Sequence, residues 1–324
     1  GIHQNTGKDK DRKDLYEIAK EKGYQVLRTR EEILAAKPGT KVIAVNPLLD
    51  GSNAMPYDMD RTPEQLSLAE FTRKGIELLD NPNGFFMMVE GGKIDWACHA
   101  NDAAATILDT FAFDAAVMEA LSFAEKHPDE TLIVVVGDHE TGGMSIGFAG
   151  TQYETFFEKI AHQKESYESF DKKIAAFRKG EEKTFEKMAP MIEESFGLRT
   201  ASAEERAALE EKAKAGDDAA RIALSMTLTD LELGELRHAF EESMLEKKER
   251  AKDEATYLLY GGYEPLSVKI THILNQKAGI GWTTYAHTGI PVPIFAKGLG
   301  SELFAGYYDN TDVAWKTMSV LGVR

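Results

Sequence analysis

Residues 85–99 read FFMMVEGGKIDWACH, an apolar run followed by two glycines and a helix-like segment. The apolar run at 85–90 has the length and composition of a buried strand, and Glu90 closes it. Open α/β sheets place their ligand sites where strands end, which makes Glu90 a candidate site residue. Asp95 and His99 follow at the start of a helix, four residues apart, so their side chains face one way and can chelate one ion. Alone this pair is weak evidence, because such pairs also form helix caps and surface hydrogen bonds.

Two further segments carry the same residue types. Residues 134–143 read VVVGDHETGG, in which an apolar strand ends just before Asp138 and His139. A carboxylate beside an imidazole at a strand end suits zinc, although an Asp that caps a turn beside a structural histidine would look the same. Residues 282–289 read WTTYAHTG and add His287, which matters only as a third contributor. Together the three segments predict that Asp95, His99, Asp138, His139 and His287 converge on one face at the C-terminal edge of the sheet, with Glu90 nearby.

Strand-like and helix-like patterns alternate up to about residue 150 and return after about residue 255. Continuous apolar strands separated by helices predict an α/β fold with a mostly parallel sheet flanked by helices on both faces. Two prolines in 290–297 favour an edge strand there. The expected helices include 62–79, with Pro63 in its first turn, and a single long helix over 96–126. The expected strands are 24–28, 41–46, 85–90 and 131–136.

Residues 151–250 differ from the rest because they are highly charged and have helical periodicity. Ser202 with Glu205, and Thr229 with Glu232, have the spacing of helix-capping boxes. This composition indicates a helical insertion that packs over or beside the site and supplies no catalytic residues. The predicted domains are an α/β metal-binding core, 1–150 with 251–324, and a helical cap or crown, 151–250.

Composition and charge exclude several classes of protein. The 324 residues are 43% hydrophobic and 28% charged, which is ordinary for a folded globular protein. The net charge of −16 argues against nucleic acid or an anionic membrane as the main partner, since both require clustered Lys and Arg. No apolar run is long enough to span a membrane, and no signal peptide is recognisable. Cys98 is the only cysteine, so no internal disulfide is expected and a small buried thiol is favoured.

The order of the motifs resembles the alkaline phosphatase family: 85–96, then 138–143, then 287–289. The resemblance covers about residues 5–150 and 255–315. It implies an alkaline-phosphatase-like fold and hydrolysis of phosphate monoesters at a site with two zinc ions (Zn2+) and one magnesium ion (Mg2+). It also implies a homodimer exported to the periplasm or the cell surface. The implied ligands are Asp95, His99 and His287 for the first zinc, Asp138 and His139 for the second, and Glu90 for magnesium.

The sequence departs from the family's pattern at the nucleophile. Family members use a serine that follows an aspartate, and no Asp-Ser pair occurs here. That serine, a metal-bridging Asp, a magnesium-binding Thr and a phosphate-clamping Arg belong to the N-terminal part of the family's chain. We therefore expect a C-terminal portion, truncated at its N-terminus, that binds zinc weakly and is alone inactive or nearly so. Trp96 stands where some members have Lys or His, and it cannot deliver a charge to the phosphate.

Two other functions remain open on these residues. A non-catalytic metal-binding or assembly module with a relic site would keep the same motifs, and the coding sequence upstream of Gly1 would distinguish it. A related two-metal phosphodiesterase, sulfatase or phosphoglycerate mutase is the second alternative. Competition between phosphate monoesters and diesters would separate this enzyme from a phosphomonoesterase.

Overall fold

The computed structural model describes residues 14–323, and the chain divides into two compact units. The polar amphipathic pattern of residues 11–23 predicts a helix there, and its first residues lie outside the described part. Among residues 14–323, no helix combines the length and apolarity needed to cross a lipid bilayer. The first unit comprises Gly1–Gly91, Thr110–Asp138 and Pro293–Arg324, and the second comprises Gly92–Asp109 and His139–Val292.

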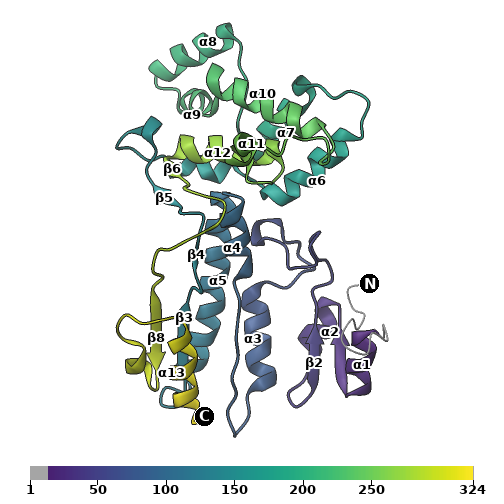
Figure 1. The fold of residues 1–324 in the computed structure, drawn as a ribbon, viewed down its shortest axis with the longest axis vertical. Helices are drawn as coiled ribbons and strands as arrows, with labels where there is room; N and C mark the ends of the chain where they lie inside the picture. The colour runs from purple at the N-terminus through teal and green to yellow at the C-terminus, as the bar shows by residue number, and fades with distance from the viewer. Residues whose placement is uncertain (1–13, 324) are drawn as a thin grey trace. The chain divides into compact units, whose positions relative to one another are not determined.

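The first unit contains two small sheets with helices beside them (Figure 1). Strands β1 and β2 pair in parallel, from Tyr24 opposite Lys41 to Leu27 opposite Ala44, and helix α2 connects them. Strands β3 and β8 pair antiparallel, from Leu132 opposite Gly298 onward. The elements are α1 (Leu15–Glu21), β1 (Tyr24–Leu27), α2 (Arg30–Ala35), β2 (Lys41–Ala44), η1 (Asp58–Asp60), α3 (Leu68–Leu79), the end of α5 (Ala103–Ala124), β3 (Leu132–Val136), β8 (Ile294–Gly298), η4 (Ser301–Phe304) and α13 (Thr311–Leu321).

The sheet differs from the expected one, although the α/β class is confirmed. Residues 14–323 form four two-stranded sheets, of which only β1–β2 is parallel, so a mostly parallel sheet is not found among them. In the predicted strand at 85–90 the side chains alternate in exposure, but the segment pairs with none of the described strands. An apolar run predicts a strand without specifying its partner, which is why the sequence patterns did not predict how the strands pair.

Helix α3 begins at a capping box, and the prediction that it starts near Pro63 is wrong. The Ser67 hydroxyl accepts a hydrogen bond from the Glu70 N–H at 3.2 Å, and the Glu70 carboxylate accepts one from the Ser67 N–H at 2.9 Å. These two bonds satisfy free N–H groups at the first turn of the helix. The side chain of Gln65 accepts from the Thr62 N–H instead, so the residues around Pro63 form a turn.

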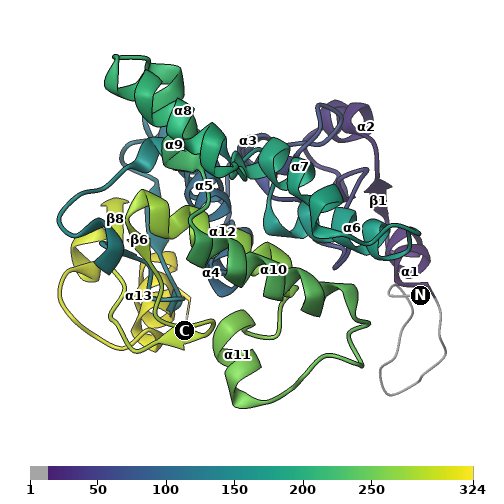
Figure 2. The ribbon, with the colours of Figure 1, turned by 90° about the horizontal axis from the view of Figure 1, so that it is seen from above.

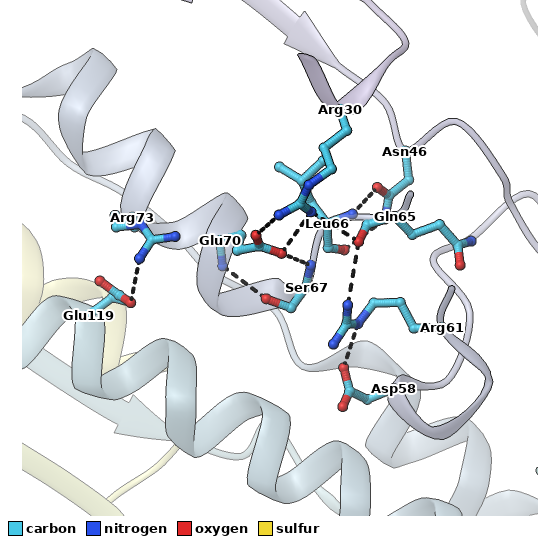
Figure 3. A network of polar contacts seen from close by, with 10 residues as sticks. All are labelled: Arg30, Asn46, Asp58, Arg61, Gln65, Leu66, Ser67, Glu70, Arg73 and Glu119. Atoms are coloured by element: carbon cyan, nitrogen blue, oxygen red, sulfur yellow. Dashed lines mark hydrogen bonds and ion pairs between the residues drawn. The ribbon is translucent and has the colours of Figure 1, made fainter. Parts of the chain in front are cut away.

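A polar network joins α2, the end of β2 and the start of α3 (Figure 3). The Asn46 side chain pairs with the Leu66 backbone, accepting from its N–H at 2.8 Å and donating to its carbonyl at 3.0 Å. Arg30 forms an ion pair with Glu70, donating through Nη1 at 3.1 Å and also through Nη2. This hydrogen bond from Arg30 is the main reason why the pKa of Glu70 falls to about 2.

The second unit consists mainly of helices grouped around α12 (Figures 1 and 2). Both predicted capping boxes are confirmed, at the starts of α8 and α10. The division into a core and a separate cap at 151–250 stays a prediction. The elements are α4 (Gly92–His99), the start of α5, β4 (Glu140–Thr141), β5 (Ser145–Ile146), η2 (Ala149–Thr151), η3 (Phe157–His162), α6 (Tyr167–Arg178), α7 (Phe185–Phe196), α8 (Ala203–Lys214), α9 (Asp218–Met226), α10 (Asp230–Met244), α11 (Glu254–Tyr260), α12 (Pro265–Ala278), β6 (Ile280–Gly281) and β7 (His287–Thr288).

The single helix expected over 96–126 is two helices, α4 and α5. The chain leaves α4 at Asn101, whose φ of 53° lies in the left-handed region. Asp102 then caps α5, because its carboxylate accepts a hydrogen bond from the Ala105 N–H at 3.0 Å. Asn tolerates left-handed backbone and Asp favours helix starts, so these two residues explain the break.

Candidate metal centre

Three side chains converge in the second unit from two elements far apart in the sequence. Asp95 and His99 lie on α4, one helical turn apart, and the His99 Nε2 is 3.4 Å from the Asp95 Oδ1. His287 lies on β7, and its Nε2 is 3.2 Å from the His99 Nε2 and 3.7 Å from the Asp95 Oδ1. Three candidate ligand atoms thus form a triangle with edges between 3.2 and 3.7 Å.

The His99 ring is held in one tautomer by a backbone carbonyl. Its Nδ1 lies 2.6 Å from the Tyr285 carbonyl oxygen, which can only accept, so the proton is on Nδ1. The lone pair is therefore on Nε2, the atom that faces Asp95 and His287. Fixing one ring nitrogen by a hydrogen bond so that the other can bind a metal is the usual arrangement for histidine ligands.

His139 lies against the same cluster and is oriented by a hydroxyl group. Its ring stacks on that of His287, with centroids 3.5 Å apart, and ligand atoms of Asp95, His139 and His287 all lie within 4.8 Å of one another. The Thr141 hydroxyl donates to the Asp95 Oδ1 at 2.5 Å and lies 3.2 Å from the His139 Nδ1. Since its one proton goes to the carboxylate, this hydroxyl accepts from Nδ1–H and leaves the His139 Nε2 with a lone pair.

The loop after β4 approaches α4 so closely that only glycine fits at position 142. Gly142 has a φ of 83°, and a Cβ there would lie 2.7 Å from the Cys98 carbonyl oxygen and from the Trp282 ring. Its N–H donates to the Ala286 carbonyl at 3.0 Å, and its own carbonyl accepts from the Thr283 N–H at 3.0 Å. These bonds, with the antiparallel pair β4–β7, hold His287 beside α4.

The other two predicted ligands, Glu90 and Asp138, and the neighbouring Cys98 and Trp96 have different surroundings. Glu90 and Asp138 belong to the first unit, where both are exposed. The Cys98 thiol is buried 3.6 Å from the Thr106 hydroxyl, and burial raises its pKa to about 11, as expected for a structural thiol. Trp96 is partly exposed, and the Lys93 ammonium lies 4.3 Å from its ring centroid.

Sequence reasoning missed the groups that orient the ligands. A signal for Thr141 existed, because it is a hydroxyl residue two positions after His139 in the second motif. The Tyr285 carbonyl could not be predicted, because a backbone acceptor has no sequence signal.

Comparison with known proteins gives one consistent result. A family model described as alkaline phosphatase matches residues 2–323. Alkaline phosphatase 3 of Bacillus subtilis (strain 168) is 32% identical over 314 residues, which are 96% of this chain and 55% of that protein. The repressible alkaline phosphatase of Saccharomyces cerevisiae is 27% identical over 333 residues, 95% of this chain and 50% of that protein. The crystal structure of a cold-active alkaline phosphatase from a psychrophilic Shewanella matches with a TM-score of 0.68 at 25% identity, covering 95% of this chain and 62% of that one.

The fold places the chain in the class of α/β proteins with an alkaline-phosphatase-like architecture. Within that class, the chain belongs to the alkaline phosphatase family, which confirms the resemblance carried by the motifs. The chain spans about half the length of the curated relatives it matches.

Proposed function

We propose that this chain carries a zinc-binding part of a phosphate monoester hydrolase centre, with Asp95, His99 and His287 as ligands of one zinc ion. The observation that carries the proposal is the triangle of ligand atoms. Zinc bonds of about 2.1 Å in a tetrahedron separate neighbouring ligand atoms by about 3.4 Å. The observed separations of 3.2, 3.4 and 3.7 Å fit that spacing, and one carboxylate with two imidazoles is a usual donor set.

The ligands of the other two metal ions are proposed from the motifs and from the kinds of donor atom that each ion prefers. Asp138 and His139 would hold the second zinc, which is supported by the position of His139 beside the first cluster, where its ring stacks on that of His287. Glu90 would bind magnesium, an ion that prefers oxygen ligands. Zinc, when bound, supplies Lewis acidity towards a phosphoryl oxygen.

In this scheme, side chains and backbone groups of the chain bind the zinc ion and orient its ligands. Asp95 contributes negative charge, Thr141 fixes that carboxylate, and the Tyr285 carbonyl keeps the His99 lone pair directed at the site. No Asp-Ser pair is available to supply the family's nucleophile. We therefore expect metal binding to be separable from turnover, with little or no monoester hydrolysis by residues 1–324 alone.

Zinc affinity tests the ligand assignment. Competition with a chromogenic chelator should show that His99→Ala and His287→Ala each weaken zinc binding by about 100-fold or more, because each removes one of three ligands. His238→Ala is the matched control, since His238 is exposed on α10 in the same unit. Equal zinc affinity in wild type, His99→Ala and His238→Ala would contradict the assignment.

Turnover is measured separately, with an aryl phosphate monoester and an aryl phosphate diester at alkaline pH with added zinc and magnesium. Negligible monoester hydrolysis by the 324-residue chain, and its appearance in a version extended at the N-terminus, is the expected result. Rapid turnover by the short chain that His99→Ala abolishes would show that a nucleophile is present after all. Faster hydrolysis of the diester would favour the phosphodiesterase alternative. Export and dimer formation stay predictions of the family resemblance.

A further inference from the structure

The break between α4 and α5 places a buried polar side chain between two other segments of the second unit. Asn101 is 2% exposed, although it is polar and its backbone is left-handed. Its backbone carbonyl accepts a hydrogen bond from the Asn275 side chain on α12 at 2.8 Å. A buried carboxamide needs hydrogen-bond partners for its two donors and its acceptor. The partners of Asn101 show which segments of the chain it joins.

The two donors of Asn101 join the segments that present the candidate ligands. Its Nδ2 donates to the Cys98 carbonyl at 2.9 Å and to the Thr284 carbonyl at 3.0 Å. Cys98 directly precedes His99, and Thr284 directly precedes Tyr285, whose carbonyl fixes the His99 ring. One amide group therefore bridges the end of α4 and the loop that leads to His287.

The acceptor of Asn101 is anchored to α12 by a histidine that is not among the candidate ligands. The His272 Nε2 lies 3.1 Å from the Asn101 Oδ1. Removal from water lowers the pKa of His272 to about 4, so its ring is neutral, and its Nε2–H donates to Oδ1. The same ring stacks on Tyr285, with centroids 5.9 Å apart. Because all three polar positions of the carboxamide are used, its orientation is fixed.

We propose that Asn101 is a positioning residue that sets the separation of His99 and His287, with His272 as its anchor. This inference rests on the proposed zinc site. Asn101 is not one of the candidate ligands and acts through the two backbone segments that it joins. Without the bridge, the 3.2 Å separation of the two Nε2 atoms would depend on the Tyr285 carbonyl, the backbone bonds of Gly142 and the short β4–β7 pair.

The test uses Asn101→Gly, because glycine adopts the left-handed backbone without strain and removes the side chain that carries the carboxamide. The matched control is Ser243→Ala on α10. It removes a buried hydroxyl that accepts from the Leu266 N–H at 2.9 Å, and so weakens the same unit away from the bridge. Urea unfolding of both variants shows whether their losses of stability are comparable. His272→Phe, which keeps a ring against Tyr285 and removes the donor, should act in the same direction as Asn101→Gly.

Three measurements on the full chain test whether Asn101 positions His99 and His287. Asn101→Gly should bind zinc at least tenfold more weakly and change the visible absorption of the cobalt-substituted protein, whereas Ser243→Ala should match wild type in both. In the metal-free protein, the NMR cross-peak between the rings of His99 and His287 should disappear in Asn101→Gly and persist in Ser243→Ala. Persistence of that cross-peak in Asn101→Gly overturns the inference, even if wild type binds no zinc. Absence of zinc binding by wild type overturns the proposed function, and the cross-peak then decides the positioning role alone.

Discussion

At the scale of single residues, the centre depends on side chains that orient ligands as much as on the ligands. The Thr141 hydroxyl lies between His139 and Asp95 and transmits a hydrogen bond from one to the other. Thr141 is buried, so its hydroxyl has few alternative partners if either bond is lost. A buried donor that fixes an anionic ligand affects both the position and the charge of that ligand.

We predict that Thr141→Val lowers zinc affinity by about tenfold or more, because valine has a similar shape but cannot orient Asp95 or His139. Thr141→Ser keeps the hydroxyl and should stay within a few-fold of wild type. Chelator competition on the folded chain provides the measurement, with circular dichroism to confirm that both variants fold. Equal losses in the valine and serine variants would mean that the methyl group, and not the hydroxyl, matters.

At the scale of elements, local sequence patterns predicted the presence of helices and strands better than they predicted where helices end or which strands pair. The capping boxes at α8 and α10 were predictable because they depend on residues three apart. The break at Asn101 was not, because the bonds that favour it come from Thr284, His272 and Asn275, more than 170 residues away. The convergence of Asp95, His99 and His287 was expected from spacing on α4 and from the motifs, whereas the antiparallel pairing of β3 with β8 was not.

A hydrogen bond between helices α6 and α12 should make the stability of the second unit depend on pH. The Ser267 hydroxyl donates to Asp171 at 2.5 Å, and burial, with help from Glu264 and Glu168, raises the pKa of Asp171 to about 7. Its ordinary value is 3.8, so the folded state holds a proton that the unfolded state has lost between these two pH values. The contribution of Asp171 to stability is therefore fully present below about pH 4 and is lost as the pH rises to 7.

We predict that Asp171→Asn, which is permanently neutral, stabilises the chain more at pH 8 than at pH 5, by about 2 kcal/mol. Urea unfolding at both values gives the difference. Asp218→Asn on α9 serves as the control because the Asp218 side chain is 80% exposed. A gain for Asp171→Asn that is the same at pH 5 and pH 8 would show that the Asp171 carboxyl is ionised at both.

At the scale of the whole molecule, the described residues leave apolar strand surface uncovered. The sequence pattern at 85–90 is that of a buried strand, yet Phe86 is 63% and Met88 is 70% exposed in the first unit. Phe295 on β8 is also exposed, at 64%. An apolar run indicates that burial of these side chains is favourable, but it does not indicate which surface would cover them. Their exposure could therefore not be predicted from the pattern alone.

Extended backbone without a strand partner is prone to pair with another molecule, and exposed apolar side chains strengthen that tendency. We therefore predict that Phe86→Lys with Met88→Thr lowers self-association of the 324-residue chain, measured by light scattering and size-exclusion chromatography over a range of concentrations. The free energy of unfolding should change by less than about 1 kcal/mol, since both side chains are exposed. Leu231→Thr is the control, because Leu231 is equally exposed, at 74%, but lies on helix α10, whose backbone is already hydrogen-bonded. If Leu231→Thr lowers self-association as much as the double variant, general surface hydrophobicity and not the unpaired strand drives it.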